Sequence, residues 1–234
     1  MKYFIALIVG IVTGAALFAA GIYFNPFSDK QSVSPLAVGS ERLLNLTYTA
    51  VPSESVLFTN DGESAIRPHP EKTAELWEDT VRNSSVMVVS LRDSRGEPAG
   101  IGVKFSSASE ATRILNSEAL VDSAWHIYLP ERGTLFVGQR ENYWAFLRDI
   151  VVKARWNSAD SWRGTWNWVM TTGPNALGTA RVSGGNGQFA DVDTEAVESL
   201  KASAYSARSG PVAMDGSLAV SLPDAAPSQT ARQD

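Results

Sequence analysis

The residue types that most often perform enzyme chemistry are scarce in this chain and poorly spaced for it. Only two histidines occur, His69 between prolines and His126 at the start of an apolar run, and neither has a second ligand at a metal-site spacing. The motifs of serine hydrolases, phosphate-binding loops and dinucleotide-binding turns do not occur. We therefore predict no catalytic residue, no metal site and no cofactor.

Carboxylates are the remaining catalytic candidates. Asp149, Asp160 and Glu141 lie near a tryptophan-rich stretch, where a pair of them could act on a glycan or lipid bond by acid–base catalysis. Any chain with 25 acidic residues offers such pairs. An envelope enzyme acting on glycan or lipid is therefore the alternative hypothesis rather than the preferred one.

A glycine-rich turn at 184–187 precedes Asp191, Asp193 and Glu195, whose oxygens suit a hard cation such as calcium. The spacing departs from the EF-hand pattern, because Ala196 stands where the loop needs glycine and Ala202 where it needs glutamate. We therefore interpret the segment as a turn followed by a helix over 194–200, with Asp193 as its cap.

Tryptophans give the chain its most distinctive local feature: Trp156, Trp162, Trp166 and Trp168 lie close together. In a strand from 162 to 170, the last three share one face. That face is core in one interpretation. In a second it lines a cleft where indole rings hold a sugar ring or an acyl chain and Arg148 binds the head group, and in a third the rings enter the bilayer interface.

The segment before this strand has two interpretations. With a period of two, one face collects six residues and is interrupted only by Arg148: Trp144, Phe146, Ile150, Val152, Ala154 and Trp156. This predicts a hairpin with three opposed pairs: Trp156 with Trp162, Ala154 with Gly164, and Val152 with Trp166. With a helical period, an apolar stripe runs through Tyr143, Phe146, Leu147, Ile150, Val151 and Ala154. Both patterns fit up to Val151, and the sequence leaves both open.

Elsewhere, alternation of apolar and polar residues predicts an antiparallel sheet. A first strand is expected at 44–50, followed by hairpins of 86–91 with 101–105, 127–129 with 134–137, and 212–214 with 217–222. The last would turn at Asp215-Gly216, a strong hairpin signal. Short helices are expected at 73–82, 108–115 and 117–124. The fold class is α+β, mainly antiparallel β, as a curved sheet or partly open barrel with a few short helices, preceded by one transmembrane helix.

The N-terminal residues from Tyr3 to Phe24 carry no charge and are numerous enough to cross a hydrocarbon layer of about 30 Å as a helix. The best cleavage site, at 19–21, lies inside this run, so we favour an anchor over a cleaved and secreted form. The leading tail is short, which favours the carboxyl-terminal bulk outside the cytoplasm. Ala6, Gly10 and Gly14 share one helix face and would admit a partner helix, although a plain anchor has the same composition.

Composition divides the chain into an anchor (1–27), a polar linker (28–40), an extracytoplasmic β-rich domain (41–222) and a disordered tail (223–234). The absence of cysteine excludes disulfides and favours a bacterial inner membrane with the domain in the periplasm. A net charge of -5 argues against nucleic acid as a partner.

These features together predict a single-pass, membrane-anchored envelope protein. Its domain is expected to be a non-catalytic binding or assembly module for an amphipathic ligand or a protein partner. A structural scaffold that associates through the transmembrane helix is a further hypothesis.

Overall fold

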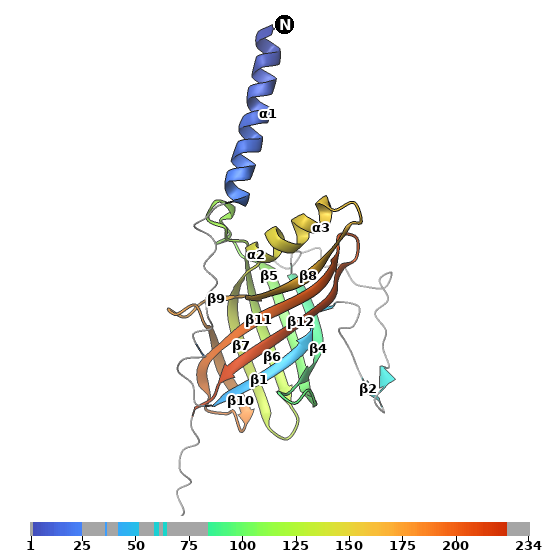
Figure 1. Ribbon diagram of the computed structural model, residues 1–234. Coiled ribbons are helices and arrows are strands. Elements are labelled where there is room, and N and C mark those ends of the chain that lie inside the picture. Colours follow the sequence, from blue (N-terminus) through green and yellow to red (C-terminus); the bar gives the residue numbers. More distant parts are fainter. Residues whose placement is uncertain are drawn as a thin grey trace, which may run out of the picture.

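The computed structural model describes residues 2–24, 36, 42–51, 59–60, 63–64 and 84–223 (Figure 1). Several predicted features lie outside these residues: the helix at 73–82, His69, all of the linker except Leu36, and all of the tail except Pro223. An apolar helix, α1 (Lys2–Tyr23), precedes a domain that is mostly antiparallel β-sheet. None of the residues of α1 is buried, and its length and hydropathy fit either a membrane anchor or a signal sequence.

The sheet contains ten strands, and two further short strands, β2 (Thr59–Asn60) and β3 (Glu63–Ser64), pair with each other. The first five strands of the sheet are β1 (Leu43–Thr49), β4 (Ser84–Arg92), β5 (Pro98–Ala108), β6 (Leu120–Leu129) and β7 (Gly133–Asn142). The other five are β8 (Ser161–Val169), β9 (Thr171–Gly173), β10 (Ala180–Gly187), β11 (Asp193–Ser206) and β12 (Gly210–Ser221).

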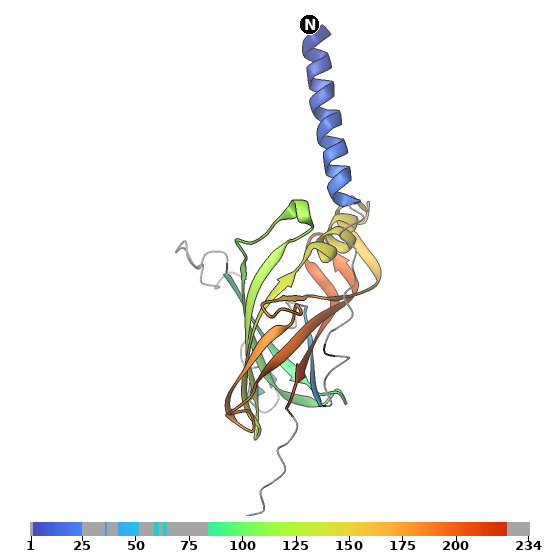
Figure 2. The same ribbon diagram turned by 90° about the vertical axis from the view of Figure 1, so that its left-hand side faces the viewer.

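These strands form a barrel. The order β10-β11-β12-β1-β4-β5-β6-β7 returns to its start because β7 also pairs with β10 (Figures 1 and 2). The seam between β1 and β4 is the weakest, with the single pair Thr47–Arg92. An eight-stranded barrel has an interior that is either filled by side chains or wide enough for one small ligand.

The barrel closes fully at one end only. β8, β9 and β10 follow one another along the gap between β11 and β7: β8 pairs only with β11, β9 pairs with β7, and β10 pairs with both. Where β7 and β8 separate, a helical segment covers the end of the barrel (Figure 1). It consists of α2 (Trp144–Phe146), the π-helical turn η4 (Leu147–Val151) and α3 (Val152–Trp156).

The helical interpretation of this segment is therefore correct, and the strand interpretation is wrong. The predicted pairs Trp156–Trp162, Ala154–Gly164 and Val152–Trp166 do not form, because β8 pairs with β11 instead. The physical reason is the spacing of the buried residues of the segment, which are Ala145, Phe146, Ile150 and Ala154. This spacing matches a helix and buries one stripe against the barrel.

Four other expectations are wrong. The predicted hairpin at Asp215-Gly216 is a continuous strand, since both residues lie inside β12. The predicted helix at 194–200 lies within β11, where every second residue from Ala196 to Ala202 is buried. Of the helices at 108–115 and 117–124, only a 3-10 turn, η3 (Ile114–Asn116), forms, and β6 begins at Leu120.

The first strand and the first two hairpins are confirmed. β4 pairs with β5 across the polar loop at 93–97, and β6 pairs with β7 across 130–132. β1 buries Leu44, Leu46 and Tyr48 at alternate positions, as its pattern predicts. Its position in the sheet is set by β12, which pairs with all seven of its residues.

The barrel interior is layered along its axis. The part near the β6–β7 turn is filled by large apolar side chains, namely Leu46, Leu91, Ile127, Leu129, Leu135 and Leu218. The middle is polar, because β5 turns Lys104 inward instead of an apolar side chain. The apolar face of β5 points outward instead, where Ile101 is 47% and Phe105 51% exposed.

Candidate functional site: a buried ion cluster below a barrel cavity

One lysine and two glutamates meet inside the barrel. Lys104 projects from β5, Glu141 from β7 and Glu198 from β11, and all three are buried. The Lys104 ammonium lies 2.8 Å from Oε1 of Glu141 and 2.7 Å and 2.9 Å from the two carboxylate oxygens of Glu198. An ammonium has three N–H donors, so these contacts use all of them.

Glu198 accepts more hydrogen bonds from the protein than Glu141 does. Besides Lys104, it accepts hydrogen bonds from the Tyr48 hydroxyl, from Nε1 of Trp125 at 3.0 Å, and from Nε2 of Gln139. The Gln139 amide is oriented in turn by Thr171, whose hydroxyl donates to its Oε1 at 2.8 Å. Donors from strands β1, β5, β6 and β7 thus converge on one carboxylate of β11.

Glu141 has fewer partners. Its Oε1 contacts Lys104, and its Oε2 accepts a hydrogen bond from Ser123 at 2.7 Å. The Tyr143 hydroxyl lies 3.4 Å from Oε1, a long contact for a hydrogen bond to a carboxylate. The two glutamates therefore share one cation but differ in how well the remaining oxygen sites are satisfied.

The pKa values of the two glutamates move in opposite directions. Burial raises the pKa of Glu141, and the nearby charge of Glu198 raises it further, against the opposing effect of Lys104. Burial alone would also raise the pKa of Glu198, but Lys104 and the hydrogen bonds from Tyr48 and Trp125 hold it below its usual range. Glu198 is thus the stable carboxylate of the cluster, meaning the one whose ionised form the fold favours.

The other titratable groups stay in their usual protonation states. Burial disfavours the charge of Lys104, but the two glutamates overcome this effect and raise the pKa of its ammonium. Burial and the charge of Glu198 raise the pKa of the Tyr48 hydroxyl well above its ordinary value. Burial and the charge of Glu141 likewise raise the pKa of Tyr143.

Two glycines make room for the aromatic donors. Gly216 lies directly opposite Tyr48 in the β1–β12 ladder, and a Cβ atom there would overlap the Tyr48 ring. A Cβ atom at Gly102 would lie 2.8 Å from the Trp125 ring. The two rings pack edge to face, with centroids 5.0 Å apart. This packing fixes the hydroxyl and the indole N–H that Glu198 requires.

A cavity of about 300 Å³ lies next to the cluster. Its wall comes from six strands and from the residues that directly follow β1 and β7: Tyr48, Ala50, Ser85, Met87, Lys104, Ser106, Val121, Tyr143, Leu200 and Met214. Most of these residues lie near the strand ends that face η3 and α2, so the cavity forms the mouth of the barrel at that end. Its size is at the lower limit for a small-molecule site. The chemistry is an apolar wall above a polar floor.

The predicted tryptophan site is only partly assembled. Trp162, Trp166 and Trp168 share the inner face of β8, where Trp166 is buried against Phe146 at a centroid distance of 5.7 Å. The indole N–H of Trp166 has no hydrogen-bond acceptor among the described residues. These rings contribute to the core below the helical segment, and none of them lines the cavity at the barrel mouth.

The other two members of that predicted site lie apart from these rings. Trp156, on α3, is 79% exposed, and its ring lies 6.0 Å from that of Tyr23 of α1. Arg148 pairs with its neighbour Asp149 at 2.9 Å. The structure therefore brings three of the predicted tryptophans together and separates Trp156 from them.

The three candidate carboxylates have three different partners. Glu141 belongs to the ion cluster, Asp149 pairs with Arg148, and Asp160 pairs with Arg208 at 2.9 Å. His126 lies on the outside of β6 and stacks on Phe136 at 4.7 Å. Among the described residues, no group of three or more histidine, aspartate or glutamate side chains is arranged to hold a metal ion.

The sequence-based prediction missed Lys104, Glu198 and Tyr48. Their signal was a charged or polar residue at an inward position of a strand, but recognising it requires knowing which face is inward. In β5 the apolar residues suggest the wrong face. In β11, Glu198 has the parity of the small residues Ala196 and Ala202, and the expected helix obscured this pattern.

No protein-family model matches this chain, and no curated protein matches it.

Proposed function

We propose that the chain is a membrane-anchored binding protein whose barrel takes one small amphipathic ligand into its mouth. α1 serves as the single membrane span, as its length, its lack of charge and its exposed apolar surface suggest. The observation that supports ligand binding is the cavity of about 300 Å³ with an apolar wall and a polar floor formed by Tyr48, Lys104 and Tyr143. The anchor and the absence of cysteine favour an envelope protein with a periplasmic domain.

The charges of the floor select the head group of the ligand. Lys104 has no N–H left for a ligand, and the cluster holds two carboxylates against one ammonium. An anionic head group would therefore meet negative charge in a site of low dielectric, at a high energetic cost. A neutral head group that exchanges a hydrogen bond with Tyr143, whose own contact to Glu141 is long, fits the floor better.

The volume limits the apolar part of the ligand. A cavity of about 300 Å³ accommodates a short chain or the end of a longer one. We therefore expect a medium-chain alcohol such as decanol to bind at least about tenfold more tightly than decanoate, a difference of about 1.4 kcal/mol. Binding would be measured by competition against a fluorescent amphipath, with the full chain in lipid nanodiscs and empty nanodiscs as the blank.

A cavity-filling variant tests the location of the site. Val121 lines the cavity, whereas Ala124 of the same strand faces outward and is exposed. Val121→Trp should abolish decanol binding, and Ala124→Trp should leave it unchanged. Equal binding by both variants would show that the ligand does not occupy the barrel mouth.

Removing one negative charge tests the selectivity. In Glu141→Gln the ammonium of Lys104 faces one carboxylate instead of two, so decanoate affinity should rise towards that of decanol. Decanoate binding more tightly than decanol in the unmodified chain would contradict the proposed neutral ligand.

A further inference from the structure

Large apolar side chains are exposed at the end of the barrel that carries η3, the helical segment and the cavity mouth. Leu115 is 63% exposed and Trp156 is 79% exposed, and Ile114 and Leu147 are partly exposed beside them. They come from two separate connections: η3 links β5 to β6, and the helical segment links β7 to β8. Water-exposed leucine and tryptophan at the tips of two connections mark an interaction surface.

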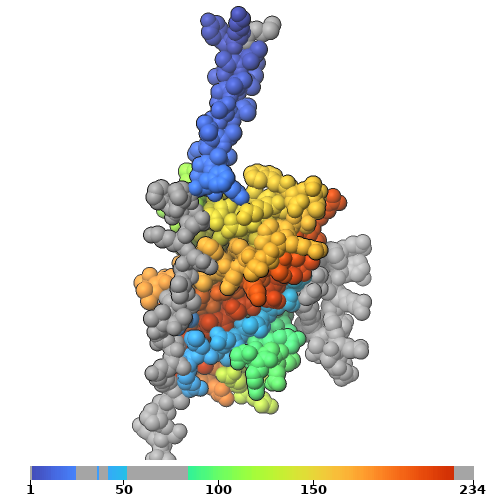
Figure 3. All heavy atoms as spheres, in the orientation of Figure 1, coloured from blue at the N-terminus to red at the C-terminus, as the bar shows by residue number. Residues whose placement is uncertain are grey.

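The same end of the domain faces α1. Figure 2 shows η3 and the helical segment on the two sides of the barrel end, with α1 rising from this end. In Figure 3 the yellow atoms of the helical segment form the upper surface of the domain below α1. Tyr23, in the last turn of α1, contacts Trp156 at a ring distance of 6.0 Å. Aromatic rings at the end of a membrane span are typical of the interface with water.

Basic side chains accompany the apolar ones. Arg113 precedes Ile114, and Lys153 and Arg155 precede Trp156; all three basic residues are exposed. The nearby acidic groups are Glu110, which is exposed, and Glu118, which is half-buried. Asp149 is paired with Arg148 and lies 3.8 Å from the ammonium of Lys153, and Asp160 is paired with Arg208. Alternating cationic and apolar residues at a protein tip favour the headgroup region of a bilayer that contains anionic lipid.

We propose that this end of the barrel rests on the bilayer that α1 crosses, with Leu115 and Trp156 inserted among the lipid headgroups. This inference rests on the proposed anchoring of α1 but not on ligand binding. Its consequence is that the cavity mouth opens towards the membrane surface. A lipid-soluble ligand can then pass between bilayer and barrel without crossing bulk water.

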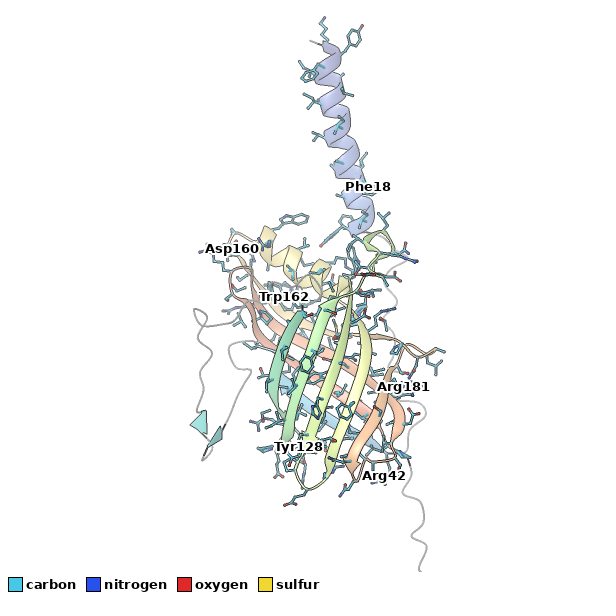
Figure 4. The ribbon with its side chains drawn as sticks, turned by 180° about the vertical axis from the view of Figure 1, so that it is seen from behind. Phe18, Arg42, Tyr128, Asp160, Trp162 and Arg181 are labelled. Atoms are coloured by element: carbon cyan, nitrogen blue, oxygen red, sulfur yellow. The ribbon has the colours of Figure 1, made fainter. Side chains whose placement is uncertain are left out.

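A second apolar surface competes for the same role. The outer face of β4 to β7 exposes Val86, Ile101, Phe105, Tyr128 and Phe136. Figure 4 views the domain from this side, and the label of Tyr128 lies far from the end below α1. If this surface met the bilayer, the barrel would have to lie on its side.

The exposed basic residues and the contact with α1 favour the end of the barrel over this side surface as the part that meets the bilayer. Arg140, a cation that adjoins the five apolar residues of the side, is paired with Asp122 at 2.8 Å. The end instead combines exposed cations with a direct contact to α1. We therefore assign the bilayer to the end of the barrel.

The absence of cysteine makes the test direct, because every introduced cysteine is unique. Spin labels would be placed in four single variants of the full chain: Leu115→Cys, Trp156→Cys, Phe136→Cys and Val12→Cys. The chain would be reconstituted in vesicles of phosphatidylethanolamine and phosphatidylglycerol. Power saturation then compares the collision of each label with oxygen, which concentrates in lipid, and with a water-soluble nickel chelate.

The Val12 label should report the bilayer interior and so tests the anchor itself. The labels at 115 and 156 should show an oxygen-to-nickel collision ratio several-fold higher than the label at 136. A lipid-exposed label at 12 with water-exposed labels at 115 and 156 would overturn the inference and leave the anchor intact. A lipid-exposed label at 136 would also overturn it, because the barrel would lie on its side.

A water-exposed label at 12 would overturn the proposed anchoring and the inference together. Ligand binding is measured separately and does not depend on these labels. Replacing phosphatidylglycerol with phosphatidylcholine should reduce the ratio at 115 and 156, because the attraction of Arg113, Lys153 and Arg155 is lost. An unchanged ratio would contradict the role assigned to the basic residues.

Discussion

Glu198→Gln should lower the free energy of unfolding by about 3–5 kcal/mol at neutral pH, whereas Glu141→Gln should change it little. Glu198 accepts from Tyr48, Trp125, Gln139 and Lys104. An amide in its place directs an N–H at some of these donors and removes the main counter-charge of Lys104. Lys104 then keeps only Glu141 as its counter-charge, and buried donors that face the new amide N–H lose their acceptor, which is the costly event.

Glu141→Gln differs because the native carboxylate of Glu141 accepts fewer hydrogen bonds than that of Glu198. An amide oxygen still accepts from Lys104, and the amide N–H can donate to Ser123. The variant also relieves the repulsion between Glu141 and Glu198. We therefore expect a change close to zero or a small gain in stability.

The pH dependence should distinguish the two residues. The pKa of Glu198 is lowered by folding, so its stabilisation is present above the unfolded carboxyl pKa of about 4.3 and is lost as pH falls through the folded value. The pKa of Glu141 is raised by folding, so wild type loses stability as pH rises through the folded value. The stability of Glu141→Gln relative to wild type should therefore increase with pH.

Urea unfolding of the full chain in nanodiscs, followed by tryptophan fluorescence at several pH values, measures these differences. Glu195→Gln is a suitable control on β11, since Glu195 lies outside the ion cluster. Equal losses for the Glu198 and Glu141 variants would contradict the assignment of Glu198 as the stable carboxylate.

Gly216→Ala should destabilise the domain by about 3 kcal/mol or more. The new methyl group would overlap the Tyr48 ring, and overpacking a core costs about 1–3 kcal/mol. Moving the ring also weakens the hydrogen bond from Tyr48 to Glu198, and a hydrogen bond to a charged group contributes about 1.5–3 kcal/mol. The midpoint of urea unfolding should fall accordingly.

Gly138→Ala is the matched control. Gly138 also lies in a strand, but it faces outward and a Cβ atom there meets nothing within 4 Å. Its replacement should change stability by no more than about 0.5 kcal/mol or increase it slightly. In the background of Tyr48→Leu, Gly216→Ala should cost less than in wild type, because the ring it displaces is gone. Additive effects would show that the glycine has another role.

Much of the sheet could be predicted because its signals are local. The alternation of Leu44, Leu46 and Tyr48 marks β1, and polar loops mark the two confirmed hairpins. In the helical segment, the apolar residues fit both a strand period and a helical period up to Val151. Only packing against β8 and β11 selects the helix. Such a choice depends on residues distant in sequence, so a local pattern leaves it open.

The errors have the same origin. Asp215-Gly216 has the composition of a two-residue turn, but its glycine is required by the ring of Tyr48 on another strand. The alternation in β5 identifies two faces without showing which one is inward, and its apolar face turned out to be the outer one. The ion cluster depends on that choice, so it became visible only once strands distant in sequence were paired.

The pairing of β1 with β12 also affects how the chain folds during its synthesis. Most neighbouring pairs in the ring join strands that lie close together in the sequence, but Leu43 of β1 pairs with Ser221 of β12. β1 therefore lacks its main partner until the last strand has left the ribosome. Pairing across such a large sequence separation is slow, so the edge of β1 stays unpaired throughout synthesis. We expect a chain truncated before Gly210 to be a target for chaperones and proteases rather than a partly folded barrel.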